Sequence, residues 1–308
     1  MIEAIPTWRF LPRRSIGKTG FVASILGIGD LADRSTPADE LVAILHRAML
    51  AGLNVIDTAP SYEDGFGEEV VGRALQGRRA DTFLIDKIDY LDQPVTPQVD
   101  ESLRRLGHGQ VDLFAFHAVA TMDDWQALAK PGGPLDELAE CVKQGKTAIL
   151  LFSGISAHHP AVVMAAIASG LCDVVMFPVG PYCDTRYIRE CLPLARAAGV
   201  GTICFKAFGA GKLVSDTQGY GRPLPSPAPG DPFGKTMAHL SVEECLRFTL
   251  TCDPDVTLLG LSTAVEQDAA FAGAADFLPY TDYEMDQIRL LATEAVEGKG
   301  PVWWDPQP

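Results

Sequence analysis

Four side chains within the first 117 residues are of the types that together reduce a carbonyl group: Asp57, Tyr62, Lys87 and His117. A tyrosine protonates an oxyanion near neutral pH when a nearby cation lowers its pKa from about 10. Lys87 is the candidate cation, and Asp57 is the candidate carboxylate partner of that ammonium group. His117 is expected to donate to a substrate oxygen or to relay a proton. The four residues predict a carbonyl-reduction site.

Taken singly, these residues also have structural explanations. Asp57 precedes a Thr-Ala-Pro-Ser turn and is typical of a cap, while Tyr62 alone is typical of a surface loop. Asp86 and Asp89 flank Lys87 and suggest a local ion-pair cluster instead. Because side chains alternate along a strand, Asp86 is expected to point away from the face that carries Lys87. The coincidence of four complementary types favours the active site.

Each of the four lies at or just beyond the end of an apolar run that is typical of a buried strand. Eight such runs follow an expected hairpin around residues 17–20, at 24–29, 53–58, 82–88, 111–117, 148–156, 172–178, 201–208 and 257–262. Nearly continuous apolar character indicates parallel strands that are covered on both faces. No G-x-G-x-x-G follows the first strand, as a doubly wound sheet would normally show.

Helical patterns alternate with these runs. They cover residues 38–51, 67–76, 96–106, 134–144, 160–169, 186–198 and 240–250. Eightfold β-then-α alternation predicts an α/β fold of the closed (β/α)₈ barrel type, as one domain over residues 1–308. Two additions are expected, a long Pro- and Gly-rich loop at 214–238 after the seventh strand and an extra helix at 282–297. The paired Trp303 and Trp304 either close the substrate pocket or pack on the barrel; packing is favoured.

The composition narrows the class of function. A formal net charge of −15 without a basic run disfavours nucleic acid as a partner. No apolar run approaches the roughly 20 residues of a membrane helix, and the first residues carry no export signal, so a cytoplasmic enzyme is expected. Seven cysteines, an odd number without a C-x-x-C pair, argue against a disulfide framework or a metal site. The composition leaves open whether the protein forms a homo-oligomer.

In order and spacing, the chain resembles the aldo-keto reductases in the stretches RRSIGKTGFVASILGIGDL, NVIDTAPSYEDGFGEEVVGRAL, FLIDK, VDLFAFH, GISAHHP, KAFGAGKL and VTLLGLSTAVEQ. The resemblance covers nearly the whole chain. It implies a metal-free barrel that moves hydride between a nicotinamide dinucleotide, NADP or NAD, and a carbonyl or alcohol. It also implies that Tyr62 is the general acid, that Lys87 and Asp57 tune its pKa, and that His117 orients the substrate.

The same resemblance implies cofactor contacts in the second half of the chain. An aromatic ring that stacks on the nicotinamide, a cation, and a segment that approaches the pyrophosphate are expected at Phe205, Lys206, Gly209, Gly211 and Leu213. Ser156 matches a serine that contacts the carboxamide. Two expected amide side chains are replaced by Ala157 and Met176. His158 and His159 are interpreted as the polar opening of the next helix.

The adenosine end departs further from the family pattern. The matching segment contains Gly260, Ser262, Glu266 and Gln267, and Glu266 or Gln267 stands where a cation usually holds the 2′-phosphate of NADP. A carboxylate repels a phosphate and accepts hydrogen bonds from a free ribose hydroxyl, which favours NAD. Three cations elsewhere are candidates to bind the phosphate instead: Lys212, Arg222 and Lys235.

Three functions remain open from the sequence. The first is a nicotinamide-dependent oxidoreductase that acts on an aldehyde, ketone or sugar. The second is a dinucleotide-binding barrel that serves as a regulatory or redox-sensing subunit, and the third is a metal-free isomerase or lyase that uses Tyr62 and Lys87 for proton transfer. Acidic loops after the strands disfavour anionic substrates, and Trp125 in the segment 119–125 offers a flat surface for a sugar or aromatic ring.

Overall fold

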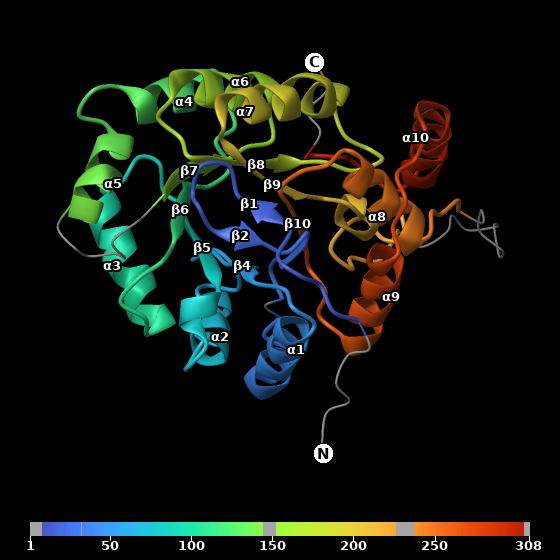
Figure 1. Cartoon of the computed structure of the whole chain (residues 1–308), viewed down its shortest axis with the longest axis horizontal. Coiled ribbons are helices and arrows are strands. Elements are labelled where there is room, and N and C mark those ends of the chain that lie inside the picture. Colours follow the sequence, from blue (N-terminus) through green and yellow to red (C-terminus); the bar gives the residue numbers. More distant parts are fainter. Residues whose placement is uncertain (1–7, 32, 144–151, 226–236, 305–308) are drawn as a thin grey trace.

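Eight parallel strands close into a barrel at the centre of the protein (Figure 1). The computed structural model describes residues 8–31, 33–143, 152–225 and 237–304. Each barrel strand pairs with the next along the chain, and the last pairs with the first. The strands are β3 (Leu26–Ile28), β4 (Val55–Asp57), β5 (Phe83–Ile88), β6 (Leu113–Phe116), β7 (Phe152–Ser156), β8 (Val174–Pro178), β9 (Gly201–Phe205) and β10 (Val256–Leu259).

Helices surround this barrel (Figure 1). They are α1 (Ala38–Leu50), α2 (Phe66–Ala74), α3 (Val95–Leu106), α4 (Met122–Ala129), α5 (Pro134–Lys143), α6 (Pro160–Ser169), α7 (Leu192–Ala198), α8 (Val242–Thr251), α9 (Ala264–Ala275) and α10 (Asp282–Val296). Short turns add η1 (Arg79–Asp81), a π-helical turn η2 (Tyr187–Cys191) before α7, and η3 (Gly209–Gly211) after β9. No helix of the described residues is long and apolar enough to cross a lipid bilayer.

The expected barrel, hairpin and additional C-terminal helix are confirmed. Residues 148–151 of the expected fifth strand, residue 144 of the expected fourth helix and residues 226–236 of the long loop lie outside the described residues. One expected pocket loop is wrong: part of the segment 119–125 belongs to α4, which begins with a capping box between Thr121 and Asp124. Trp125 is buried there in the core and offers no open surface to a ligand.

Alternation along the strands divides the core into two parts. Side chains such as Val55, Phe83 and Ile85 pack inside the barrel, while Ile56 and Leu84 pack outward against the helices. Because the period along a strand is two residues, every second residue beyond these positions also faces the barrel axis. This parity decides which polar side chains reach the open end of the barrel.

A two-stranded hairpin closes the amino-terminal end of the barrel. The strands β1 (Arg14–Ser15) and β2 (Val22–Ala23) pair antiparallel and lie in front of the barrel centre in Figure 1. Ile16 of the hairpin is fully buried within the inner core. The hairpin thus leaves the carboxyl ends of the strands as the open end.

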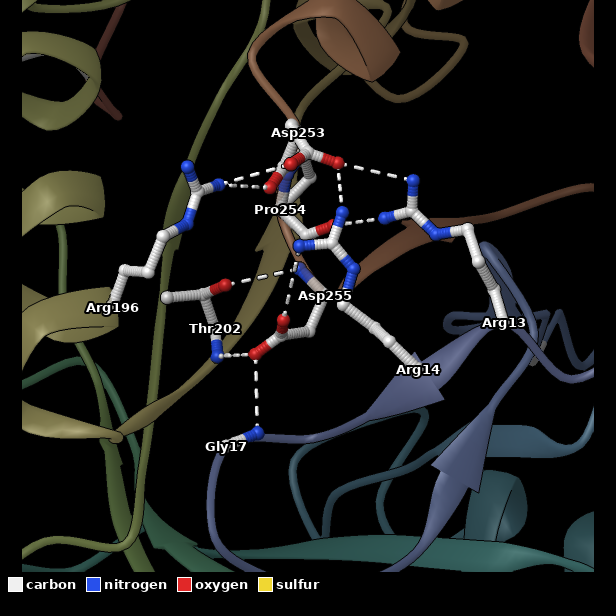
Figure 2. A network of polar contacts seen from close by, with 8 residues as sticks. All are labelled: Arg13, Arg14, Gly17, Arg196, Thr202, Asp253, Pro254 and Asp255. Atoms are coloured by element: carbon white, nitrogen blue, oxygen red, sulfur yellow. Dashed lines mark hydrogen bonds and ion pairs between the residues drawn. The ribbon is translucent and has the colours of Figure 1, made fainter.

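An ion-pair network fastens this hairpin to the turn before β10 (Figure 2). Asp253 binds Arg13, Arg14 and Arg196, and its main chain is left-handed, with φ of 60°. Asp255 accepts hydrogen bonds from the main-chain amides of Gly17 and Thr202 at 3.2 and 2.9 Å. A cavity of about 240 Å³ lies beside the network. Since these arginines are paired with Asp253, we interpret the network as structural: it holds the hairpin against the turn before β10.

Candidate active site

The strand ends bring the predicted tetrad together. Asp57 ends β4, Lys87 lies near the end of β5, and His117 directly follows β6. Each of the three stands two residues after a side chain that packs inside the barrel, so each also points inward. They therefore meet at the open end of the barrel.

Tyr62 reaches the site from the loop between β4 and α2. Its amide donates to the carbonyl of Ala59 at 3.1 Å. The next residues, Glu63, Asp64 and Gly65, are all left-handed, and α2 begins directly after them. Left-handed Glu and Asp are strained conformations, which are held only where the surrounding structure fixes them. The turn therefore holds Tyr62 in one place.

Lys87 is fully buried and paired. Its Nζ makes an ion pair with Asp57 and donates to the carbonyl of Thr58 at 3.0 Å. Side-chain exposure is 1% for Lys87 and 5% for Asp57. A buried ammonium requires such partners, because desolvation otherwise removes its charge.

Tyr62 lies between Lys87 and His117. The Nζ of Lys87 is 5.4 Å from the centroid of the Tyr62 ring, and the His117 ring meets the same ring edge-on, with centroids 5.8 Å apart. A phenol, an ammonium and an imidazole therefore converge on one point, where a substrate oxygen can accept a proton.

Asp89 is a site residue that the sequence analysis assigned only to a local ion-pair cluster. Its carboxylate binds Nδ1 of His117 and accepts from the amide of Ser61 at 2.7 Å. Burial opposes the charge of Asp89, but the bonds from His117 and Ser61 outweigh it and lower its pKa. The signal was its spacing: Asp89 stands two residues after Lys87, on the same face.

The pKa of Tyr62 departs from the expected direction. Burial, followed by the charges of Asp57 and Asp30, raises it well above 10. Burial is the largest cause, and Asp57 pairs with Lys87, the cation that was expected to lower the pKa of Tyr62. Tyr62 is therefore protonated at neutral pH and ready to act as an acid.

Asp86 points away from the tetrad, as the alternation predicts. It lies behind β5 near Glu68 of α2, and Arg105 of α3 pairs with Glu68 at 2.7 Å. Burial and the charge of Glu68 raise the pKa of Asp86 well above its ordinary value. Asp86 is thus a buried carboxyl with a raised pKa that lies outside the active site.

The expected nicotinamide contacts lie at the ends of β7 to β9. Ser156 is 4% exposed and pairs in register with Met176, which is buried in the inner core. Phe205 is partly buried, and its ring meets that of His158 edge-on at 5.4 Å. His158 therefore belongs to this wall of the site rather than only to the start of α6.

The segment after β9 forms a tight left-handed turn. Gly209, Ala210 and Gly211 have φ angles of 53, 53 and 90°. The amides of Gly209, Gly211 and Leu213 donate to carbonyls within the turn, and Leu213 is buried in a core with α8 and α10. A pyrophosphate at this turn would therefore be held by other donors of the segment.

Two lysines near this turn have different surroundings. The Nζ of Lys206 contacts the hydroxyl of Tyr220 and lies 5.4 Å from the centroid of the Phe205 ring. Lys212, by contrast, is fully buried and donates to three carbonyls of the tail. Lys212 is therefore not available to a phosphate, while Lys206 is.

The two tryptophans near the carboxyl terminus differ in exposure. Trp304 is fully buried, as the packing interpretation expects. Trp303 is 41% exposed and lies 5.7 Å from the ring of Tyr220. Tyr220 in turn acts electrostatically on Tyr62. Trp303 and Tyr220 thus stand beside the mouth of the site.

The residues that the family resemblance assigns to the adenosine end of the cofactor differ in burial. The carboxylate of Glu266 accepts from the amide and hydroxyl of Thr263 in a capping box at the start of α9. Gln267 is buried and bonded to Arg47 and to the carbonyl of Ile44, so its side chain faces α1. Gly260 is exposed and Ser262 is half-buried in the loop before α9.

The protein belongs to the aldo/keto reductase family, whose model matches residues 25–292. The chain is 27% identical to L-galactose dehydrogenase of Arabidopsis thaliana over 313 residues, which covers 92% of this chain and 93% of that protein. It is 28% identical to the uncharacterized oxidoreductase YqkF of Bacillus subtilis over 196 residues, 59% of this chain and 60% of that protein.

Solved structures of the family share the fold. The holo form of aldo-keto reductase AKR11C1 from Bacillus halodurans superposes with a TM-score of 0.68 at 22% identity, over 95% of this chain and 100% of that chain. An aldo-keto reductase from Klebsiella pneumoniae in complex with NADPH gives 0.66 at 17% identity, over 93% and 96%. The family is one of oxidoreductases that use NADP or NAD, which confirms the expected class of activity and of cofactor.

Proposed function

We propose that this protein transfers hydride between NADP or NAD and the carbonyl group of a small aldehyde, ketone or sugar, with Tyr62 as the general acid and base. The convergence of Lys87 and His117 on the Tyr62 ring carries the proposal. A sugar is favoured among these substrates, because the chain is similar over 92% of its length to L-galactose dehydrogenase.

The residues at the open end suit a nicotinamide dinucleotide. Phe205 offers a partly buried ring, Ser156 a hydroxyl at the end of β7, and Lys206 a cation without a carboxylate partner among the described residues. When bound, the nicotinamide would supply or accept the hydride at the carbonyl carbon.

Side chains of the protein carry out the proton transfer. In reduction, the hydroxyl of Tyr62 donates its proton to the carbonyl oxygen and becomes a tyrosinate. The buried ammonium of Lys87 stabilises that anion, and Asp57 keeps Lys87 charged and in place. His117, held through Nδ1 by Asp89, presents its other nitrogen to the substrate oxygen. Solvent then returns the proton to Tyr62.

The direct test is binding followed by turnover. NADPH and NADH are titrated against the protein while tryptophan fluorescence is followed, and their oxidation is then measured with L-galactose, other aldoses and methylglyoxal. Quenching with turnover supports the proposal. Binding without turnover would favour the regulatory alternative, which the replacements Ala157 and Met176 motivate, and absence of binding would contradict both.

A further inference from the structure

We propose that His158 contacts the ligand directly and exchanges hydrogen bonds with an uncharged group that both donates and accepts. Two groups have this chemistry, a hydroxyl of the substrate and the carboxamide of the nicotinamide. The inference rests on the function proposed above and assigns a binding residue that the tetrad does not include.

His158 stands between the two halves of the site. It follows Ser156 by two residues, and its ring lies edge-on to that of Phe205, with an interplanar angle of 86°. The charges of Lys206 and His117 both act on it. A group bound between the tetrad and the Phe205 ring therefore lies within reach of this imidazole.

The imidazole is neutral under physiological conditions. Burial, followed by the positive charges of Lys206 and His117, lowers the pKa of His158 to about 4. A neutral imidazole has one N–H donor and one nitrogen acceptor. It therefore complements a hydroxyl or an amide, whereas an anion would be attracted to Lys206.

Within the described residues, neither ring nitrogen of His158 has a hydrogen-bond partner. Four other histidines each contact an oxygen atom of the protein: His46, His108, His117 and His239. The nitrogens of His158 also differ from Nδ1 of His159, which is buried without a partner. A half-buried imidazole with open nitrogens at the mouth of a barrel is placed for a ligand.

Two substitutions separate hydrogen bonding from packing. His158→Phe keeps a ring against Phe205 and removes both hydrogen-bonding atoms. His158→Asn keeps a donor and an acceptor and removes the ring. Ligand recognition requires that His158→Phe is the more damaging change, whereas a packing role requires the reverse order. His108→Ala, which alters a histidine bonded to the carbonyl of Gly72, is the control.

Two paired measurements identify the ligand group. The first is the Kd of the 3-acetylpyridine analogue of NADPH, in which a methyl group replaces the carboxamide nitrogen, divided by the Kd of NADPH itself. The second is the kcat/KM ratio of the most active aldose in the panel and its 2-deoxy analogue. We expect His158→Phe to reduce one of these ratios by about fivefold, the effect of one lost hydrogen bond.

A reduced first ratio assigns the carboxamide, and a reduced second ratio with unchanged NADPH affinity assigns the substrate hydroxyl. If both ratios stay at the wild-type values in His158→Phe, or if His158→Asn is the weaker variant, the inference is wrong while the proposed function stands. Wild-type protein that binds no dinucleotide would overturn the proposed function and this inference together.

Discussion

Lys212 and Lys299 each donate a hydrogen bond to the main-chain carbonyl of the other. The Nζ of Lys212 lies 2.6 Å from the oxygen of Lys299, and the Nζ of Lys299 lies 2.8 Å from the oxygen of Lys212. Both side chains are fully buried. Burial lowers the pKa of each lysine. The charge of Lys299 lowers the pKa of Lys212 further, whereas Asp216 partly offsets the effect of burial on Lys299. The exchange ties the tail with Trp303 to the segment that follows β9.

Loss of the hydrogen bonds of Lys299 should destabilise the protein. Lys299→Met leaves the carbonyls of Lys212, Ser215 and Ala238 without their donor, so we expect the free energy of unfolding to fall by about 2 kcal/mol. Urea denaturation measures the change. Lys143→Met, at a lysine side chain that is 72% exposed, should have little effect; equal losses in both variants would show that the exchange does not stabilise the fold.

Tyr62→Phe removes the proton donor and keeps the ring. We expect kcat for carbonyl reduction to fall by about 100-fold or more, while the Kd of the cofactor stays within a few-fold. Steady-state kinetics and fluorescence titration measure the two effects. Tyr283→Phe, on the exposed face of α10, is the control. A Tyr62→Phe enzyme with nearly wild-type kcat would remove Tyr62 from the mechanism.

The partners of Tyr62 should shift its pKa in opposite directions. Lys87→Met removes a cation that favours tyrosinate, so the alkaline limb of the reduction rate should move to higher pH. Asp57→Asn removes a carboxylate that raises the pKa of Tyr62, so the limb should move to lower pH. Profiles of kcat against pH decide the matter. Shifts of the same sign would mean that the limb does not report Tyr62.

Asp86→Asn should stabilise the protein increasingly as the pH rises above about 4. In the unfolded chain Asp86 ionises near pH 4, whereas burial and the charge of Glu68 raise its pKa in the fold. The folded state then binds the extra proton, and wild-type stability falls with rising pH through this window. Asparagine has no such proton and keeps the acceptor for the amide of Lys87.

Urea denaturation at several pH values measures this difference. Each unit between the folded and unfolded pKa is worth about 1.4 kcal/mol. The exposed Asp92→Asn should leave the pH dependence of the wild type unchanged. A constant difference between Asp86→Asn and wild type at all pH values would show that Asp86 is ionised in the fold.

Glu266 should disfavour NADP relative to NAD. Glu266→Arg is expected to shift the ratio of the two dissociation constants toward NADP by at least several-fold, because a cation replaces a carboxylate near the 2′-phosphate. Glu266→Gln is the matched variant, since glutamine preserves the capping box with Thr263 and removes only the charge. It should produce a smaller shift in the same direction.

Titration of both cofactors against the three proteins measures these ratios. A strong wild-type preference for NADPH that neither variant changes would place the phosphate on another cation, and Arg222 and Lys235 would then be the candidates. Lys212 would not, because three tail carbonyls already bind its ammonium group.

The barrel and the tetrad follow from local patterns in the sequence. Strand periodicity is a property of neighbouring residues, so it placed Lys87 and Asp86 on opposite faces of their strand without knowledge of the fold. The apolar runs likewise placed Asp57 and His117 at or just beyond strand ends. Parallel strands whose carboxyl ends share one end of a barrel then bring such residues together.

Other features depend on contacts between distant segments and were decided only by the tertiary structure. Lys212 was a candidate for phosphate binding until the tail, 87 residues away, supplied its acceptors. Gln267 turned toward α1, and Trp125 entered the core on a helix that strand patterns do not predict. The direction of the Tyr62 pKa shift likewise depended first on burial of the phenol and then on the charges of Asp57 and Asp30, because both are set by the segments that fold around it.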